Sequence, residues 1–187
     1  EDPFEVKNIL KYWVFSEKPE FHVIPTDTIN IHIDKDALLR SGIMLPKTIR
    51  HLKGEDLKDA IPDKLYIPLT DIRMLTKVDL LMLEMLANCN WERPLYMAIS
   101  VGEVSKLKFD HYFVQEGLAF RFTPFDYKKW GNVKGDNNYA IDVERLYENV
   151  MNRYKYGGLD TPGLYLDETT LRTCYYHRRL SPNWQRN

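Results

Sequence analysis

The chain has 187 residues, of which 44% are hydrophobic and 13% aromatic, with 26 basic and 27 acidic side chains and a formal net charge of −1. This length and composition are typical of a single soluble globular domain spanning residues 1–187. The charge balance excludes the strongly basic proteins that bind phosphate backbones, so we predict no nucleic-acid partner. No apolar run approaches the roughly 20 residues of a membrane span.

The two cysteines, Cys89 and Cys174, are too few for a disulfide framework, and we expect both to be buried thiols. A single bridge between them stays open if the chain lies in an oxidising compartment. No signal peptide is visible, and the abrupt ends of the chain suggest a fragment of a longer protein.

The first half of the chain predicts short elements around one alternating strand. Phe4 to Phe15 carries apolar residues whose spacing fits either a helix or an extended segment. Thr28–Asp34 alternates between apolar and polar residues, which predicts a half-buried strand. Asp34 or Asp36 then caps a short helix. Lys64–Leu69 predicts a short strand near an edge, because Pro68 cannot donate a hydrogen bond to a neighbouring strand.

The strongest helix signal lies at Thr76–Asn88. Thr76 occupies the cap position, and Asp79 occupies the acidic position of a capping box three residues later. The helix is apolar around most of its circumference, which predicts that it is largely buried. Leu95–Val101 follows as an apolar strand. Residues 64–100 therefore predict a strand, a helix and a strand joined by a right-handed crossover between parallel strands.

The last third of the chain predicts a strand and two helices. Leu118–Phe125 alternates as a strand, Asp142–Tyr156 has helical spacing behind an Asp cap, and Asp167–Arg179 forms a final helix that Pro182 ends. Together the elements predict an α/β domain. We expect its strands to form one small, mixed or mainly parallel sheet of about four strands, with the helices packed on it.

The segment Asn88–Tyr96 is the richest cluster of polar and aromatic residues, and it supports two interpretations. In the first, a loop after the helix presents ligand-binding side chains, for which the candidates are Asn88, Asn90, Trp91, Arg93 and Tyr96. In the second, the segment is a structural corner in which an Asn supplies a left-handed cap and Trp91 fills the core. The residues alone favour the structural corner.

Neighbouring aromatic residues are a second candidate feature, because aromatic rings stack on carbohydrate. The candidates are Tyr12-Trp13, Tyr127 with Trp130, and Tyr175-Tyr176, although core packing is the commoner use of such side chains. The five histidines lack the spacing of metal ligands, and the chain has no nucleophile elbow or glycine-rich phosphate loop. We therefore predict no catalytic residue, no metal site and no cofactor.

Four segments stand out together, namely Ile24-Pro25-Thr26-Asp27, Leu86 to Ala98, Val114 to Arg121 and Tyr165 to Arg172. In this order they resemble the soluble region after the membrane spans in a bacterial multi-pass membrane protein family of unknown function. That family is protein O-mannosyltransferase-like and is grouped in the C-type glycosyltransferase superfamily. This chain departs from the family pattern at Cys89 and Glu92, where Asn and Lys are usual.

The resemblance implies a non-catalytic accessory domain of a membrane-embedded glycosyltransferase, because the catalytic acid and lipid-phosphate site of such enzymes lie in the membrane part. The domain would position the acceptor or support the active site, on the periplasmic, non-cytoplasmic side of a bacterial inner membrane. Its expected partners are the rest of its own membrane protein and an acceptor protein or glycan. The alternative is a structural or assembly module, without a ligand of its own, that links the membrane spans to helical repeats starting at about residues 167–187.

Overall fold

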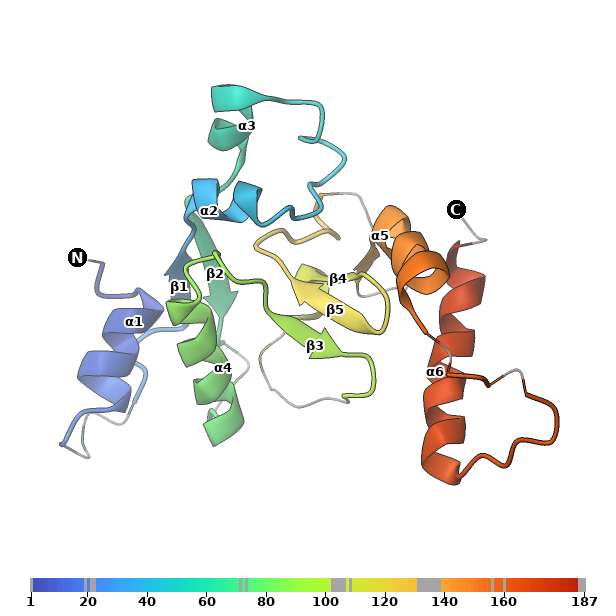
Figure 1. Cartoon of the computed structure of the whole chain (residues 1–187). Helices are drawn as coiled ribbons and strands as arrows, with labels where there is room; N and C mark the ends of the chain where they lie inside the picture. Colours follow the sequence, from blue (N-terminus) through green and yellow to red (C-terminus); the bar gives the residue numbers. More distant parts are fainter. Residues whose placement is uncertain are drawn as a thin grey trace.

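The computed structural model describes residues 2–18, 20, 23–70, 72, 74–101, 107, 109–130, 139–155, 157–159 and 161–184. In the first half of the chain (Figure 1) the elements are α1 (Val6–Ile9), the π-helical turn η1 (Leu10–Val14), β1 (Thr28–His32), α2 (Lys35–Arg40), α3 (Gly54–Ala60), β2 (Lys64–Pro68) and α4 (Lys77–Asn88). In the second half they are β3 (Tyr96–Ala98), the short 3-10 helix η3 (Asp110–Tyr112), β4 (Phe113–Gln115), β5 (Ala119–Phe122), β6 (Ala140–Ile141), α5 (Val143–Glu148), the π-helical turn η4 (Asn149–Arg153) and α6 (Glu168–Trp184).

The strands form two separate sheets. β1 and β2 make an antiparallel pair, and the second sheet has the order β3-β5-β4-β6, in which only the β4–β6 pair is parallel among the described strands. The prediction of an α/β domain with a small mixed sheet is confirmed. The predictions of one shared sheet and of a parallel crossover over residues 64–100 are wrong, because β2 and β3 lie in different sheets.

The chain turns sharply between α4 and β3. Asn90 and Trp91 both have left-handed backbone conformations, with φ of 46° and 60°, and the strand that follows them pairs with β5. The Trp91 indole donates a 2.8 Å hydrogen bond to the carbonyl of His32 at the end of β1. Its ring also stacks on Phe122 of β5, with 6.2 Å between ring centroids. Trp91 therefore joins the two sheets, and their buried apolar residues form one continuous core.

Helix α4 begins as its sequence predicts but is buried on one face only. The Thr76 hydroxyl and the Asp79 carboxylate form a complete capping box. Leu83, Leu86 and Ala87 are buried, whereas the apolar residues on the opposite side are exposed, namely Val78, Leu81 and Met85. The prediction of a largely buried helix is therefore wrong. α4 contacts α1 and β1, and these neighbours cover one side of it.

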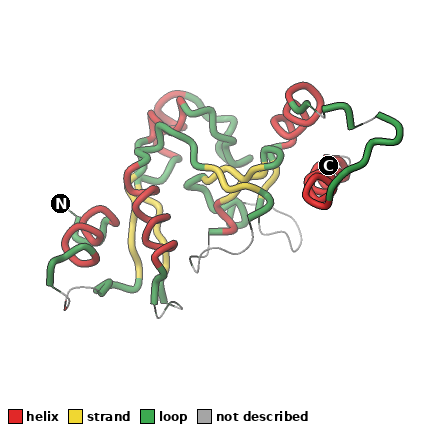
Figure 2. Tube along the Cα trace, turned by 60° about the horizontal axis from the view of Figure 1, so that its bottom comes forward, coloured by secondary structure: helices red, strands yellow, loops and turns green. Residues whose placement is uncertain are grey.

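The C-terminal helix α6 lies at the opposite end of the molecule from α1 (Figure 2). Asp167 caps it by accepting hydrogen bonds from the backbone N–H groups of Thr169 and Thr170. The helix continues two residues past Pro182 to Trp184, so the prediction that this proline ends it is wrong. Because Pro182 lies in the last turn, it removes a single N–H and does not break the middle of the helix.

The C-terminal region packs mainly as helix on helix. α6 contacts α5, and the Tyr154 ring meets the His177 ring edge-on at 5.4 Å between centroids. The predicted end of the preceding helix, Tyr156, lies outside the described residues. None of the helices in the described part of the chain is long and apolar enough to cross a membrane.

Candidate functional site

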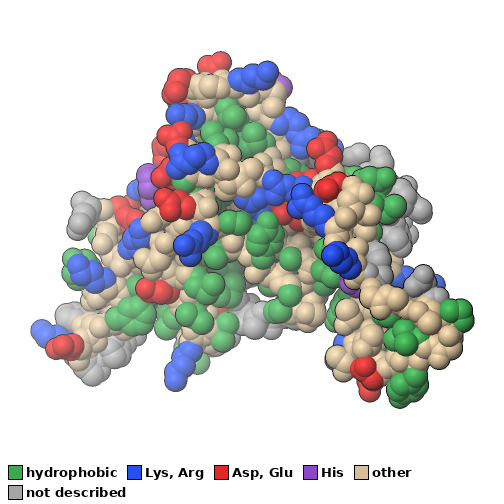
Figure 3. All heavy atoms as spheres, viewed as in Figure 1, with side chains coloured by type: hydrophobic (Ala, Val, Ile, Leu, Met, Phe, Trp, Pro, Cys, Tyr) green, Lys and Arg blue, Asp and Glu red, His purple; other side chains and the backbone are tan. Residues whose placement is uncertain are grey.

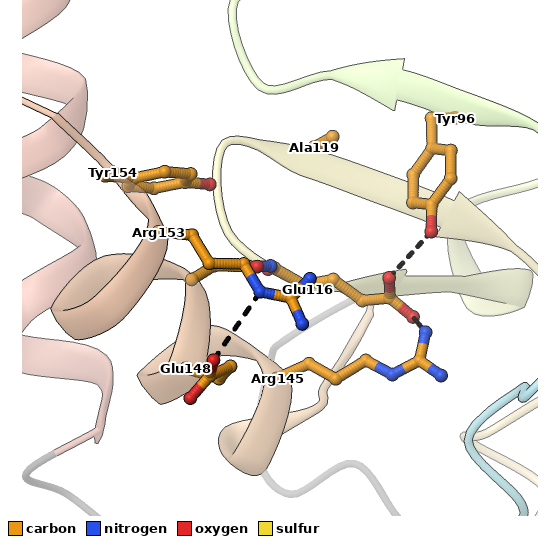
Figure 4. A pocket seen from close by; sticks show the side chains of 8 residues that line it. Tyr96, Glu116, Ala119, Arg145, Glu148, Arg153 and Tyr154 are labelled. Carbon is orange, nitrogen blue, oxygen red and sulfur yellow. Dashed lines mark hydrogen bonds and ion pairs between the residues drawn. The ribbon is translucent and has the colours of Figure 1, made fainter.

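A cavity of about 580 Å³ lies between the four-stranded sheet and the helical segment α5–η4. Its volume falls within the range of about 300–1,000 Å³ that is usual for ligand sites. The residues that line it come from three stretches of chain that the fold brings together (Figure 4), namely Tyr96, Glu116, Ala119, Arg145, Glu148, Asn149, Arg153 and Tyr154.

Glu116, directly after β4, is the buried carboxylate of this cavity. One of its oxygens accepts a hydrogen bond from the Tyr96 hydroxyl at 2.9 Å, and the other accepts one from Arg145 Nη1 at 2.9 Å. The Arg121 guanidinium lies 3.6 Å from the same carboxylate. Hydrogen bonds of this kind to charged groups are short and strong, and they hold the carboxylate in a fixed orientation.

The two arginines are fixed by the loop after α2. Arg121 Nη2 donates 2.8 Å hydrogen bonds to the carbonyl oxygen and to the hydroxyl of Ser41. The Gly42 carbonyl accepts hydrogen bonds from both Arg121 and Arg145. Gly42 has a φ of 64°, and a Cβ at this position would lie 3.0 Å from the Arg145 guanidinium. The loop thus connects α2, the sheet and α5 around Glu116.

Tyr154 closes the other end of the cavity. Its hydroxyl accepts the backbone N–H of Leu118 at 2.8 Å, and this contact depends on Gly117. Gly117 has a φ of 142°, and a Cβ there would lie 2.2 Å from the Tyr154 hydroxyl oxygen. The Asn149 side-chain amide donates a hydrogen bond to the Glu116 carbonyl. Asn149 and Tyr154 together therefore hold the turn between β4 and β5.

The charges in the cavity are paired. Arg153 Nε lies 3.5 Å from the Glu148 carboxylate, and Arg145 is paired with Glu116. Burial, and secondarily the hydrogen bond to Glu116, raise the pKa of the Tyr96 hydroxyl. Tyr96 therefore stays protonated at neutral pH and acts as a donor to the carboxylate.

Comparison with known families assigns the chain. Residues 1–144 match the family model described as TMEM260-associated domain 2. The chain belongs to this family. No curated protein and no solved structure matches it. The match confirms the resemblance at the level of an accessory domain of a TMEM260-like, protein O-mannosyltransferase-like membrane protein, whereas the bacterial family stays a prediction.

The cavity extends beyond the stretch that matches TMEM260-associated domain 2. Tyr96, Glu116 and Ala119 lie within that stretch, and the remaining lining residues begin at Arg145. Among the side chains the structure describes, no group of His, Cys, Asp and Glu is arranged to hold a metal ion.

The five ligand-binding candidates of the Asn88–Tyr96 segment do not share one site. Only Tyr96 lines the cavity around Glu116. Asn88 donates to the backbone and side chain of Glu84 on its own helix. The Asn90 side chain accepts a hydrogen bond from the Lys7 ammonium group. Asn90 and Trp91 also line a second cavity, of about 350 Å³, beside β1. Arg93 is exposed. The left-handed conformation of Asn90 and the burial of Trp91 confirm the structural-corner interpretation for these two residues.

The aromatic pairs also separate. Tyr127 is fully buried and packs with Trp130 around Phe125, so this predicted sugar-binding pair belongs to the core. Tyr12 and Tyr175 are exposed and stay candidates. Cys89 and Cys174 are both free thiols of intermediate exposure, so the expectation of fully buried thiols is wrong.

Sequence reasoning missed the residues at the centre of the cavity. Glu116 and Gly117 stand within a segment quoted for the family resemblance, and an acidic residue directly before a glycine was the available signal. Arg145 and Arg153 lie between the apolar positions of the predicted helix, and Tyr154 was one of those apolar positions, which indicated packing and not a cavity.

Proposed function

We propose that this chain is a non-catalytic accessory domain of a membrane-embedded, protein O-mannosyltransferase-like glycosyltransferase, in which it positions the acceptor or supports the active site. The match to TMEM260-associated domain 2 carries this proposal. The cavity supports it, because Glu116 and Glu148 are each paired with an arginine. Both carboxylates thus hold neighbouring side chains in place, which fits an accessory role.

The partners follow from the same proposal. The domain contacts the rest of its own membrane protein and an acceptor protein or glycan, on the non-cytoplasmic side of the membrane, which is the periplasm in a bacterium. The formal net charge of −1 fits this assignment, in which nucleic acid is not a partner.

Sugar transfer by the membrane-embedded parent protein tests the proposal. The 187-residue chain alone should transfer no sugar to an acceptor protein. In the parent, Arg153→Gln should raise the acceptor KM by about tenfold, equal to about 1.4 kcal/mol of binding free energy, and leave kcat nearly unchanged. Arg172→Gln is the matched control, because Arg172 forms a similarly exposed ion pair with Glu168 on α6, at 3.6 Å. Transfer by the isolated chain, or an unchanged acceptor KM in the Arg153 variant, contradicts the proposal.

The alternative is a structural or assembly module that links membrane spans to downstream helical repeats. One observation favours it: α6 exposes Leu171 and Tyr175, one helical turn apart. In that case Leu171→Ser should weaken binding between this chain and the downstream segment of the parent, measured by co-purification of the two as separate polypeptides. The chain should also have no affinity for glycans. Unchanged co-purification would exclude this role for the exposed face of α6.

A further inference from the structure

We infer that the cavity around Glu116 binds a neutral carbohydrate, a polyhydroxylated ligand without net charge. This inference deepens the proposed function and rests on it for the source of the ligand, since it names the chemical class that the accessory domain holds. Three properties of the cavity carry it: its balanced charge, the kind of hydrogen-bonding groups that it presents, and its two fixed tyrosine rings.

The charge of the cavity is balanced by its own side chains. Arg145 and Arg153 contribute two positive charges, and Glu116 and Glu148 contribute two negative charges in pairs of 2.9 Å and 3.5 Å. Just behind the lining, Arg121, 3.6 Å from Glu116, and Asp142, 3.7 Å from Arg145, add one further charge of each sign. Figure 3 shows basic and acidic side chains meeting in the region between the sheet and α5. An anionic or a cationic ligand would face one repelling partner for each attracting one. A neutral ligand meets no such opposition.

The cavity presents hydrogen-bond donors and acceptors side by side. Guanidinium groups donate only and ionised carboxylates accept only, whereas a sugar hydroxyl can do both. Two neighbouring hydroxyls can therefore engage a paired arginine and glutamate without breaking the pair. Arg153 is suited to this role, because 70% of its side chain is exposed while its Nε lies beside Glu148.

Two tyrosine rings stand at opposite ends of the cavity (Figure 4). The Tyr96 hydroxyl is fixed by Glu116, and the Tyr154 hydroxyl is fixed by the Leu118 N–H. Tyr96 remains 50% exposed, so its ring is held in place but not covered. Rings that are fixed before binding lose little conformational entropy when a ligand packs on them. The apolar C–H face of a sugar ring is the complementary surface.

The binding test uses the 187-residue chain and NMR titration with methyl mannoside, methyl glucoside and a neutral mannose disaccharide. We expect saturable shifts of the Arg153 side-chain N–H and of the Tyr96 and Tyr154 ring signals. Methyl glucuronide, inorganic phosphate and a Ser/Thr-rich peptide are the competing ligand classes. We expect each to bind at least about tenfold more weakly, a difference of about 1.4 kcal/mol.

Two pairs of variants locate the binding. Arg153→Gln should weaken the sugar Kd by about tenfold, whereas Arg172→Gln, in an equivalent surface ion pair, should not change it. Tyr96→Ser should abolish saturable binding, whereas Tyr66→Ser, at a tyrosine of β2 that is 57% exposed, should preserve it. Circular dichroism of each variant checks that the fold is retained.

Several outcomes overturn the inference. These are no saturable shift with any neutral sugar, equal affinity in the Arg153 and Arg172 variants, or preferential binding of the glucuronide, phosphate or peptide. Failure here is distinct from failure of the proposed function. If the chain binds no sugar, Arg153→Gln can still raise the acceptor KM of the parent, and only the present inference fails. If the chain binds sugar but Arg153→Gln leaves that KM unchanged, only the proposed function fails.

Discussion

Replacement of Gly117 by alanine should destabilise the domain through the contact that holds Tyr154. The backbone conformation at this position, with φ of 142°, costs a residue with a Cβ about 1–3 kcal/mol. The new Cβ would lie 2.2 Å from the Tyr154 hydroxyl, so the ring must move and lose its hydrogen bond to the Leu118 N–H, at about 1 kcal/mol. We therefore expect the free energy of unfolding to fall by about 2–4 kcal/mol, with an unchanged denaturant slope in urea.

A double-mutant cycle separates the two contributions. Tyr154→Phe alone should cost about 1 kcal/mol, because the Leu118 N–H loses its acceptor. In the double variant that hydrogen bond is lost once and the collision with the hydroxyl is gone. The combined loss should therefore be smaller than the sum of the single losses by about 1 kcal/mol or more.

Gly163→Ala is the control for backbone strain. Gly163 has a φ of 76°, and a Cβ there would meet no atom within 4 Å. Its cost should add to that of Tyr154→Phe. If the losses in free energy of unfolding of Gly117→Ala and Tyr154→Phe also add within about 0.5 kcal/mol, the reasoning is refuted. The cost of Gly117→Ala would then come from backbone strain alone and not from the contact with Tyr154.

Three further predictions concern the fold. Thr76→Ala should lower the free energy of unfolding in urea by about 1 kcal/mol, because α4 loses its capping box; a change below the measurement error would contradict that role. Trp91→Ala should cost about 3–5 kcal/mol, since the residue joins both sheets, and a loss typical of a surface position would show that another contact joins them. Burial raises the pKa of Tyr127, so the folded state holds this proton more tightly than the unfolded state does. Stability should therefore be complete below the ordinary tyrosine pKa of about 10 and fall as the pH rises above it. Urea unfolding between about pH 8 and about pH 11 measures this loss, and Tyr127→Phe should reduce it; an equal loss in the variant would assign it to other groups.

The starts of α2, α4, α5 and α6 were predictable because they depend on side chains that act within three residues of themselves. Asp34 and Thr76 each accept the backbone N–H three positions later, as do Asp142 and Asp167. An Asp or Thr before an apolar-periodic segment contains nearly all the information that this interaction needs. The ends of the helices were less well predicted, as Pro182 shows, because a helix end also depends on what packs beyond it.

The pairing of strands and the facing of α4 depend on partners that the local sequence does not reveal. An apolar strand after a helix fits a parallel crossover, whereas β3 pairs antiparallel with β5 in the other sheet. The buried face of α4 follows from its contacts with α1 and β1, and α1 itself fitted two interpretations in the sequence. The cavity was beyond prediction for a related reason: Tyr96, Glu116 and Arg145 become neighbours only through the strand register.

The structural and the ligand-binding interpretations of the Asn88–Tyr96 segment are connected by geometry. Trp91 is anchored to His32 and Phe122, which fixes where β3 begins. β3 then pairs with β5 so that Tyr96 lies opposite Arg121, and from that register the Tyr96 hydroxyl reaches Glu116. Trp91 thus positions Tyr96, which lines the cavity. A Trp91 variant that still folds should therefore weaken sugar binding through the position of Tyr96, although Trp91 itself does not line that cavity.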